Sequence, residues 1–506
     1  VDYRSVTRAA IPTIGAYELL TKPGVWKADA ATTSWTTGTN WVSGTVPSPT
    51  GGVSIFIPEN TVNVPVVSTT VTVGRFVNAT TQPIVVNSGV TLTLRGELIQ
   101  HATPGVLNAT NATLRFAGTE PQSIGGIVNV NNLQVDNVAG VGISSGVVNL
   151  FGRYTPINGT LTANGRLLFV SNANGTASVA TGLGTISGNV ITQRFIPAKA
   201  ARKSIFVGSP VTARIDTSWQ RQIHITGAIG TCPAVSSNGF DVTLTGNPSM
   251  FTYTHANPSG QRWVKINNTN LTSLTPTSGY RLLVRGNRSA GCTLLDGSAQ
   301  AATAVTLQAI GVLAQGDIAE GLVEGFNFIA NPYQSPINFD NVASDNSTNI
   351  DASYWTYNPE NNNGVFSVYN AGVLTNKPAG YTNDNIIATG QAFFVRKSTA
   401  GGASVTNFFR ESHKSTTAQP GLFRTQNWLG MTRVALRAND DAHIDEAVVR
   451  FGNQQGVSNT AEGTYDALNI SEGTEGISSQ KAGNRYSIQT RRGVTTADTV
   501  SLHVVS

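Results

Sequence analysis

The chain has 506 residues, of which 12% are charged, and its formal net charge is only +5. This length exceeds what one hydrophobic core organises, so we expect two to four domains. The small positive excess, without a long basic run interleaved with aromatic residues, argues against a nucleic-acid partner. No apolar run approaches the ~20 residues needed to cross a bilayer, which argues against a membrane span.

Residues 1–50 form a leader rich in tryptophan, with Trp26, Trp35 and Trp41 set among Thr, Gly and Asn. Large side chains at the start of a repetitive domain are typical of a cap that covers its open end. The alternative is an aromatic platform that stacks on sugar rings. We favour the cap. The preceding apolar segment Thr7–Pro23 is predicted to dock on a neighbouring subunit or an open strand edge.

Residues 51–197 are predicted to form a β-solenoid-like domain. Short apolar runs, such as Val90–Leu94, Ala112–Phe116 and Leu167–Val170, recur between Gly, Asn and Ser turns. Within the runs, apolar and polar residues alternate with period 2, and no helical period of 3.6 is visible. Stacked repeats of this kind build long surfaces rather than deep catalytic clefts.

The pattern breaks near Pro197, and longer strands with longer loops follow. We expect β-sandwich domains of the jelly-roll or immunoglobulin-like type over 198–414 and again over 415–506. The last segment ends on a strand-like run, so we expect an incomplete sheet that a further segment or another chain completes. The predicted fold class is therefore all-β throughout.

Two cysteines, Cys232 and Cys292, both fall within the 198–414 segment. They could form one disulfide or remain two buried thiols, and we favour the disulfide. Such a bond would close a loop of about 60 residues and stabilise the domain by roughly 4 kcal/mol. It would also indicate an oxidising compartment outside the cytoplasm.

Several motifs occur in a fixed order along the chain: Asp2–Ser5, Gly24–Trp26, Thr39–Val42, Pro47, Gly188–Pro197, Phe251–Tyr253, Tyr280–Gly286, Gly325–Pro336, Tyr354–Asn358, Gly390–Val395 and Asp445–Phe451. This ordered set resembles large secreted and cell-surface Bacteroidetes proteins, many of them adhesin-like, that the type IX secretion system exports. The resemblance implies a secreted or surface location and a C-terminal sorting domain, which is not in this sequence. It also extends to Asp498-Thr499-Val500, which is similar to the Bacteroidetes O-glycosylation pattern and marks Thr499.

The residues offer little catalytic chemistry. Gly142–Gly146 matches the Gly-x-Ser-x-Gly nucleophile elbow, but the strand-to-helix context that this motif needs is missing, so we expect a solenoid turn. The six histidines lack zinc-ligand spacing. The acidic patch at Asp440, Asp441 and Asp445 could gather oxygen ligands around Ca²⁺, although a solvated loop is the favoured interpretation. We expect no other cofactor.

These patterns favour a non-enzymatic extracellular structural or adhesive protein that self-assembles through terminal segments or strand addition. Its expected partners are copies of itself or other surface proteins, with glycans as candidate ligands. The alternative is a carbohydrate-binding or accessory region of a secreted hydrolase. That alternative would use the leader tryptophans or the aromatic set Tyr354, Trp355 and Tyr357.

Overall fold

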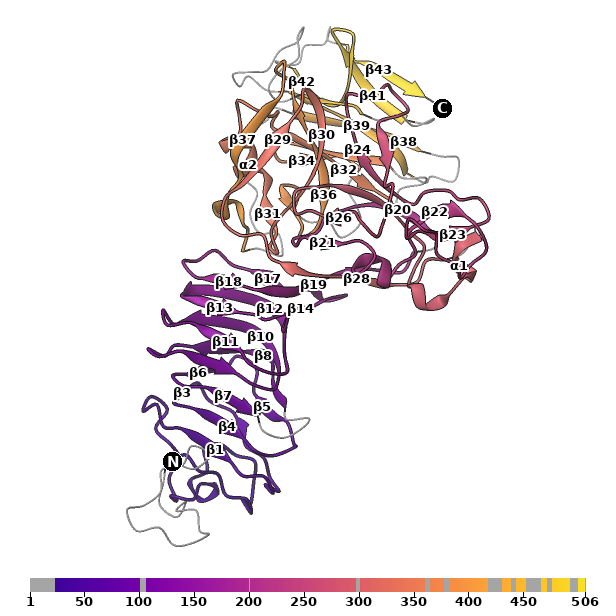
Figure 1. The fold of residues 1–506 in the computed structure, drawn as a ribbon. Helices are drawn as coiled ribbons and strands as arrows, with labels where there is room; N and C mark the ends of the chain where they lie inside the picture. The colour runs from indigo at the N-terminus through magenta and orange to yellow at the C-terminus, as the bar shows by residue number, and fades with distance from the viewer. Residues whose placement is uncertain are drawn as a thin grey trace. The chain divides into compact units, whose positions relative to one another are not determined.

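The computed structural model describes most of the chain (Figure 1). The chain folds into two compact units. The first unit runs to Gln193 and includes Ile310–Val312 from the end of β28 (Val305–Val312), and the second contains the rest. The described residues are 23–100, 106–199, 201–296, 301–359, 365–376, 383–416, 430–437, 443–451, 466–470, 476–491 and 499–505.

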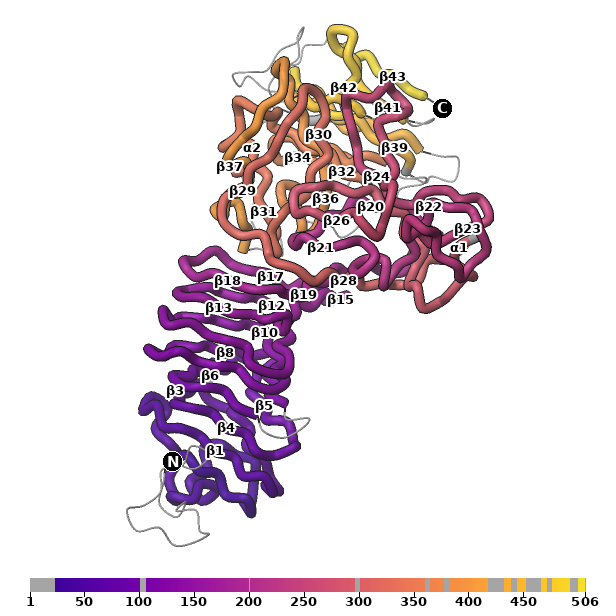
Figure 2. The backbone as a smooth tube through the Cα atoms, in the orientation of Figure 1, coloured from indigo at the N-terminus to yellow at the C-terminus, as the bar shows by residue number. Residues whose placement is uncertain are grey.

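The first unit is a parallel β-solenoid of about six turns, and Figure 2 shows its backbone coiling through successive turns. Half of the described residues lie in strands and only 5% in helices, which confirms the all-β prediction. One sheet of the solenoid consists of β1 (Ile55–Ile57), β4 (Phe76–Asn78), β7 (Leu98–Gln100), β9 (Gln122–Ile124), β11 (Val141–Ile143), β13 (Thr160–Thr162) and β18 (Thr185–Ser187).

The second solenoid sheet contains the longest strands. It consists of β2 (Val66–Val67), β3 (Val71–Val73), β5 (Ile84–Val86), β6 (Thr91–Leu94), β8 (Val106–Phe116), β10 (Ile127–Asp136), β12 (Val147–Asn158), β14 (Leu167–Phe169), β17 (Ser178–Val179), β19 (Asn189–Ile196) and β28. A small hairpin of β15 (Ser171–Asn172) and β16 (Gly175–Thr176) is antiparallel.

Period-2 alternation creates the solenoid core. In β8, buried and partly exposed residues alternate along most of the strand, so one face points inward and the other to solvent. The parallel register then stacks like side chains on one another. Leu114 pairs with Leu133, and Leu133 pairs with Tyr154, and all three are fully buried. Each turn therefore buries the apolar face of its neighbours, as expected of stacked repeats.

The leader tryptophans belong to this core. Val25 bridges to Phe56 and Ser34 to Val66, so the leader extends both sheets by parallel pairing. The short 3-10 helix η1 (Gly38–Asn40) precedes Trp41. The Trp41 ring packs edge-on against both other leader tryptophans, with centroid distances of 4.9 and 4.8 Å. The three rings therefore form part of the buried interior of the first unit, and their role as a cap stays a prediction.

The second unit is built around three larger antiparallel-rich sheets. The first is β20 (Lys203–Val207), β27 (Tyr280–Val284), β24 (Met250–Tyr253) and β25 (Trp263–Lys265). The next is β30 (Gly325–Ala330), β36 (Ala392–Lys397), β32 (Ser353–Asn358), β33 (Val365–Asn370) and β34 (Val373–Leu374). The last is β38 (Gly430–Arg437), β39 (His443–Phe451), β42 (Asn484–Arg491), β41 (Gly476–Lys481) and β43 (Ser501–Val505), with β40 (Ala467–Leu468) beside β42.

Four strand pairs and several short helices complete the described part of this unit. The pairs are β21 (Ala213–Arg214) with β26 (Ser273–Leu274), β22 (Thr226–Ile229) with β23 (Asp241–Thr243), β29 (Ile318–Leu322) with β37 (Ala403–Phe409), and β31 (Ile337–Asn338) with β35 (Ile386–Ile387). The helices are η2 (Trp219–Arg221), η3 (Arg288–Ala290), α1 (Thr293–Asp296), α2 (Phe339–Asp345) and η4 (Glu411–His413). None of the described helices has the length and hydropathy needed to cross a membrane.

Strand β36 separates two hydrophobic cores of the second unit. Adjacent residues of a strand point to opposite faces, so Phe393 enters one core and Phe394 the other. The Phe394 core also holds Trp355, Val448 and Ile488, and it therefore joins segments on both sides of residue 414. The predicted β-sandwich architecture is not confirmed for this unit.

Candidate functional site

A cavity of about 710 Å³ opens in the second unit. We call it the aromatic–arginine cavity, because rings and guanidinium groups dominate its lining. Its rings are Phe206, Tyr253, Trp263, Phe326, Tyr357 and Phe366, with Phe394 beneath them. Its polar lining includes Arg262, Arg281, Arg485, Ser259, Asn469 and Asn484. Its size lies within the range that small ligands occupy.

The rings are fixed by packing against one another. Phe394 of β36 lies 4.8 Å from Tyr253 in an edge-on arrangement and 4.6 Å from Phe328, measured between ring centroids. Trp263 of β25 packs edge-on against Phe328 at 5.3 Å. Interlocked rings of this kind stabilise each other by about 0.5–1.5 kcal/mol per pair. The cavity floor is therefore preorganised, whereas Tyr253, Trp263 and Tyr357 remain partly exposed.

The arginines approach this aromatic floor from three strands or loops. The guanidinium of Arg281, on β27, lies 5.2 Å from the centroid of the Trp263 ring, which is cation–π geometry. Arg262 donates from Nε to the backbone carbonyl of Asn257 at 3.3 Å. Arg485, on β42, is exposed at the rim. No carboxylate lies among the described lining residues, so the charged groups of this lining are cationic.

Tyr357 responds electrostatically to its position in the cavity. Burial raises the pKa of its phenol, and the positive charge of Arg281 opposes that change. The phenol therefore stays protonated at neutral pH and can donate a hydrogen bond. Tyr357 combines a partly exposed ring with a polar hydroxyl, which suits it to contact a ligand that has both apolar and polar faces.

The other two residues of the predicted aromatic set are not accessible to a ligand. Tyr354 is buried, stacks on Tyr369 and donates its hydroxyl to the carbonyl of Asp384 at 2.5 Å. Trp355 is buried too, and its indole donates to the carbonyl of Leu468 at 2.8 Å. Only Tyr357 of the three lines the cavity. The prediction was wrong for Tyr354 and Trp355, because neighbouring residues cover both faces of β32 at these two positions.

The leader tryptophans do not form a sugar platform. Trp26, Trp35 and Trp41 are each at most 1% exposed. The Trp26 indole donates to the carbonyl of Asn63 and the Trp41 indole to the carbonyl of Trp35. Their faces are occupied by each other, so none can stack on a ligand ring.

The proposed calcium ligands do not form a described site. Asp440 and Asp441 lie outside the described residues. Asp445 is buried, and its two carboxylate oxygens accept hydrogen bonds from Asn376 at 2.7 Å and from the backbone N–H of Ile477 at 2.8 Å. Its oxygens are used to join two segments of the fold. Within the part of the chain that the structure describes, no group of three potential metal ligands occurs.

The remaining sequence motifs have ordinary structural positions. Thr499 is exposed just before β43, and its carbonyl accepts a hydrogen bond from Arg491. Its glycosylation stays a prediction. Ser144, in the Gly142–Gly146 motif, lies between β11 and β12 and donates to the carbonyl of Ile124 at 3.1 Å. A strand follows this serine instead of a helix, as expected of a solenoid turn.

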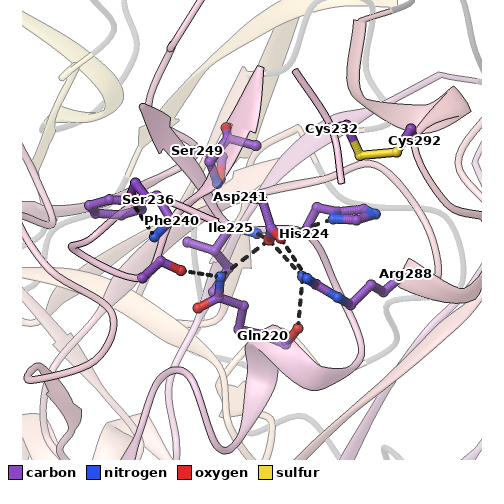
Figure 3. Close-up of polar contacts among 12 residues, drawn as sticks. Gln220, His224, Ile225, Cys232, Ser236, Phe240, Asp241, Ser249, Arg288 and Cys292 are labelled. Carbon is purple, nitrogen blue, oxygen red and sulfur yellow. Dashed lines mark hydrogen bonds and ion pairs between the residues drawn. A yellow bond between two sulfur atoms is a disulfide. The ribbon is translucent and has the colours of Figure 1, made fainter. Parts of the chain in front are cut away.

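A second polar cluster surrounds Asp241 at the start of β23 (Figure 3). Arg288 donates two hydrogen bonds to this carboxylate, at 2.6 and 2.5 Å. The amide of Gln220 and the backbone N–H of Ile225 also donate to it, at 3.2 and 3.0 Å. Burial would raise the pKa of Asp241, but its interactions with His224 and Arg288 outweigh this and lower it to about 2.

This cluster is a structural anchor and not a catalytic triad. His224 Nδ1 lies 3.5 Å from the Asp241 carboxylate, and neither ring nitrogen has a hydrogen-bond partner among the described residues. The nearby serines are engaged elsewhere: Ser249 accepts from the N–H of Thr226, and Ser236 accepts from the N–H of Phe240. A nucleophile needs a base within hydrogen-bond reach, and neither of these serines has one here.

A disulfide joins Cys232 to Cys292, with their Cα atoms 5.8 Å apart. Cys292 follows Arg288 closely in the chain, and Cys232 lies between β22 and β23. The covalent bond and the Arg288–Asp241 ion pair therefore tie the same segment to the β22–β23 region, as Figure 3 shows. Both tethers lie in the second unit.

Sequence reasoning missed the arginines and most rings of the cavity. Its lining residues are scattered from Phe206 to Arg485, so no local motif unites them. The only local signal was aromatic alternation, as in Tyr253 and Tyr357, and core strands show the same pattern. Strand pairing brings Phe206 opposite Arg281, and Tyr253 opposite Trp263.

Residues 231–506 match the family model described as Domain of unknown function (DUF8693). The match covers more than half of the chain. The chain belongs to the DUF8693 family. The DUF8693 region contains Asp241, Arg288, the disulfide and every cavity residue named above except Phe206, whereas Gln220, His224 and Ile225 of the Asp241 cluster precede it. No curated protein matched, and no solved structure matched.

Proposed function

We propose that this DUF8693 protein is a non-enzymatic, extracellular binding protein of the adhesive kind, and that the aromatic–arginine cavity is its recognition site. The cavity is the observation that carries the proposal. It offers preorganised rings, hydrogen-bonding amides and cationic groups, which are binding chemistry. The solenoid contributes a stacked surface, and the disulfide is consistent with an oxidising compartment.

The proposal is tested by binding without turnover. The full chain is applied to an array of glycans and peptides, and each captured compound is recovered for mass spectrometry. We expect compounds to be retained and recovered unchanged. Tyr357→Ala should reduce retention at least tenfold, because it removes a partly exposed ring from the lining. Retention insensitive to this substitution, or chemical conversion of the captured compound, would count against the proposal.

A matched control is available in the first unit. Phe151, on β12, is an aromatic residue that is 37% exposed and does not line the cavity. Phe151→Ala should leave retention unchanged. Thermal unfolding of both variants should be measured alongside, so that loss of folding is distinguished from loss of binding.

The export route is part of the same proposal. The motifs that resemble type IX secretion substrates support transport to the cell surface or medium. In the native host, we expect the protein in the surface or medium fraction, and we expect it to accumulate inside cells when the type IX machinery is disrupted. Unchanged export without that machinery would remove this part of the proposal.

Self-association is a second candidate function, favoured by strand β43. This strand pairs with β41 at the end of its sheet, and Leu502 and Val504 on it are 41% and 50% exposed. An exposed apolar edge strand can pair with another chain. We expect concentration-dependent association in sedimentation experiments, and Leu502→Lys should weaken it. A single monomeric species at high concentration would contradict this idea.

A further inference from the structure

We infer that the aromatic–arginine cavity selects an acidic saccharide, that is, a sugar ring carrying a carboxylate or a sulfate. This inference rests on the proposed function and adds the chemical class of the ligand. Three features of the lining carry it: guanidinium groups without a balancing carboxylate among the described lining residues, partly exposed ring faces, and amide and hydroxyl groups at the rim.

Arg281 is the best-fixed cation of the cavity lining. Its guanidinium lies over the Trp263 ring at 5.2 Å and at 5.9 Å from the Phe251 centroid, so aromatic rings hold it in place. Among the described residues it forms no ion pair. Arg485, at the rim, also lacks an ion pair within the described part of the chain. A held guanidinium presents a planar set of donors that matches a carboxylate or sulfate.

Three other arginines of the second unit differ from Arg281, because each is paired with a carboxylate. Arg288 is neutralised by Asp241, Arg214 by Asp216 and Arg396 by Asp351. In the cavity, by contrast, Arg281 and Arg485 form no ion pair with the described residues, in a protein with few charged residues. An anionic ligand would supply the missing charge.

The remaining lining favours a sugar over a simple anion. The partly exposed rings of Trp263, Tyr253 and Tyr357 offer faces and edges to the C–H groups of a sugar ring. The exposed Asn484 at the rim has an amide that can donate and accept hydrogen bonds, which suits ligand hydroxyls. The volume of about 710 Å³ exceeds what an inorganic anion needs.

Calorimetric titration of the full chain tests the inference with three probes. They are a uronic acid trisaccharide, the same trisaccharide as its neutral methyl ester, and a sulfated disaccharide. We expect at least one acidic probe to bind about tenfold or more tightly than the neutral ester, and the two acidic probes distinguish carboxylate from sulfate recognition. The preference should weaken as salt is raised.

Two arginine variants locate the effect. Arg281→Gln should remove most of the preference for the acidic probes, since it deletes the guanidinium beside Trp263. Arg221→Gln is the control, because Arg221 is an exposed arginine of the same unit that does not line the cavity. The control should keep the preference. Arg281→Lys should recover only part of it, because a lysine keeps the charge and loses the planar donors.

The outcomes separate this inference from the proposed function. Equal binding of the acidic and neutral probes, still sensitive to Tyr357→Ala, would overturn acidic selection and leave the binding function standing. Cavity-dependent binding of phosphopeptides, with no saccharide bound, would also overturn the saccharide assignment. If no array compound is retained in a Tyr357-dependent way, the proposed function itself fails.

Discussion

The carboxylate of Asp241 shows how one residue can anchor a loop-rich region. It receives donors from η2, from the segment preceding β22 and from η3, so a single buried side chain joins three elements. Its pKa is about 2 in the folded protein, against about 3.9 for an unperturbed aspartate. The difference makes the ionised form a source of stability.

The sign of this effect predicts acid sensitivity. A depressed folded-state pKa contributes stability that is complete above about pH 5 and is lost as the pH falls toward 2. The contribution is about 2.5 kcal/mol. Asp241→Asn should lower the free energy of unfolding at pH 7 by about 3–5 kcal/mol, because Arg288 loses its buried partner. It should also flatten the decline between pH 5 and pH 2, as measured by denaturant titration.

Asp216 is the matched control, because Arg214 donates two hydrogen bonds to it as well. This pair lies at the surface, with the Arg214 side chain 52% exposed. Asp216→Asn should therefore cost less than about 1 kcal/mol. Equal losses from the two substitutions would show that burial of the Asp241 pair does not matter.

The disulfide gives a second prediction at residue scale. The cysteines are 60 residues apart in sequence, and a loop of this size corresponds to roughly 4 kcal/mol in the chain-entropy model. The double variant Cys232→Ser, Cys292→Ser should lose about this much stability in denaturant titrations. Reductant should destabilise the wild type and leave the variant unaffected. A variant that responds to reductant as strongly as the wild type would contradict the assignment.

At the scale of elements, the solenoid turns depend on close contact between successive turns. Gly159 has a φ of +77°, and a Cβ there would lie 1.8 Å from the carbonyl oxygen of Asn137 in the neighbouring turn. Gly165 has a similar φ of +72°, but a Cβ added at Gly165 would have no heavy atom within 4 Å. The two glycines share one backbone requirement and differ in their surroundings.

This difference predicts unequal effects of alanine. Gly165→Ala should cost about 1–2 kcal/mol, which is the penalty for a left-handed backbone at a residue with a Cβ. Gly159→Ala should cost a further 1–3 kcal/mol or so, because the turns must separate. The two variants are compared by thermal unfolding. Equal shifts in the midpoint temperature would show that the neighbouring turn adapts to the Cβ of residue 159 without a cost in free energy.

The solenoid could be predicted from the sequence because period 2 and turn residues are local signals. Leu92 and Leu94 of β6 are buried, whereas Thr91 and Thr93 between them are partly exposed, as their alternation predicts. The cavity could not be predicted in this way. Tyr354, Trp355 and Tyr357 look equivalent in sequence, and Trp355 and Tyr357 even share a face of β32, so only the tertiary packing at each position determines that Tyr357 lines the cavity.

At the scale of the whole molecule, the two compact units predict two unfolding transitions. Leu133→Ala leaves a cavity at a fully buried position of the solenoid. It should lower the midpoint temperature of one transition, with a loss of about 2–5 kcal/mol in the free energy of unfolding. Reduction of the disulfide should lower the midpoint temperature of the other transition, because both cysteines lie in the second unit. Scanning calorimetry would show this, and a single transition that shifts with both changes would contradict it.

Parallel stacking also has a consequence for how such a protein can diversify. Register partners in β8, β10 and β12 recur at intervals of about 20 residues, and each new strand adds to the previous one in the same orientation. Insertion or deletion of one such interval would lengthen or shorten the stack by about 4.8 Å while preserving its inward-facing residues. The family model covers residues 231–506 and leaves the stack outside it. Homologues could therefore differ in the number of solenoid turns while keeping the region that the family model covers.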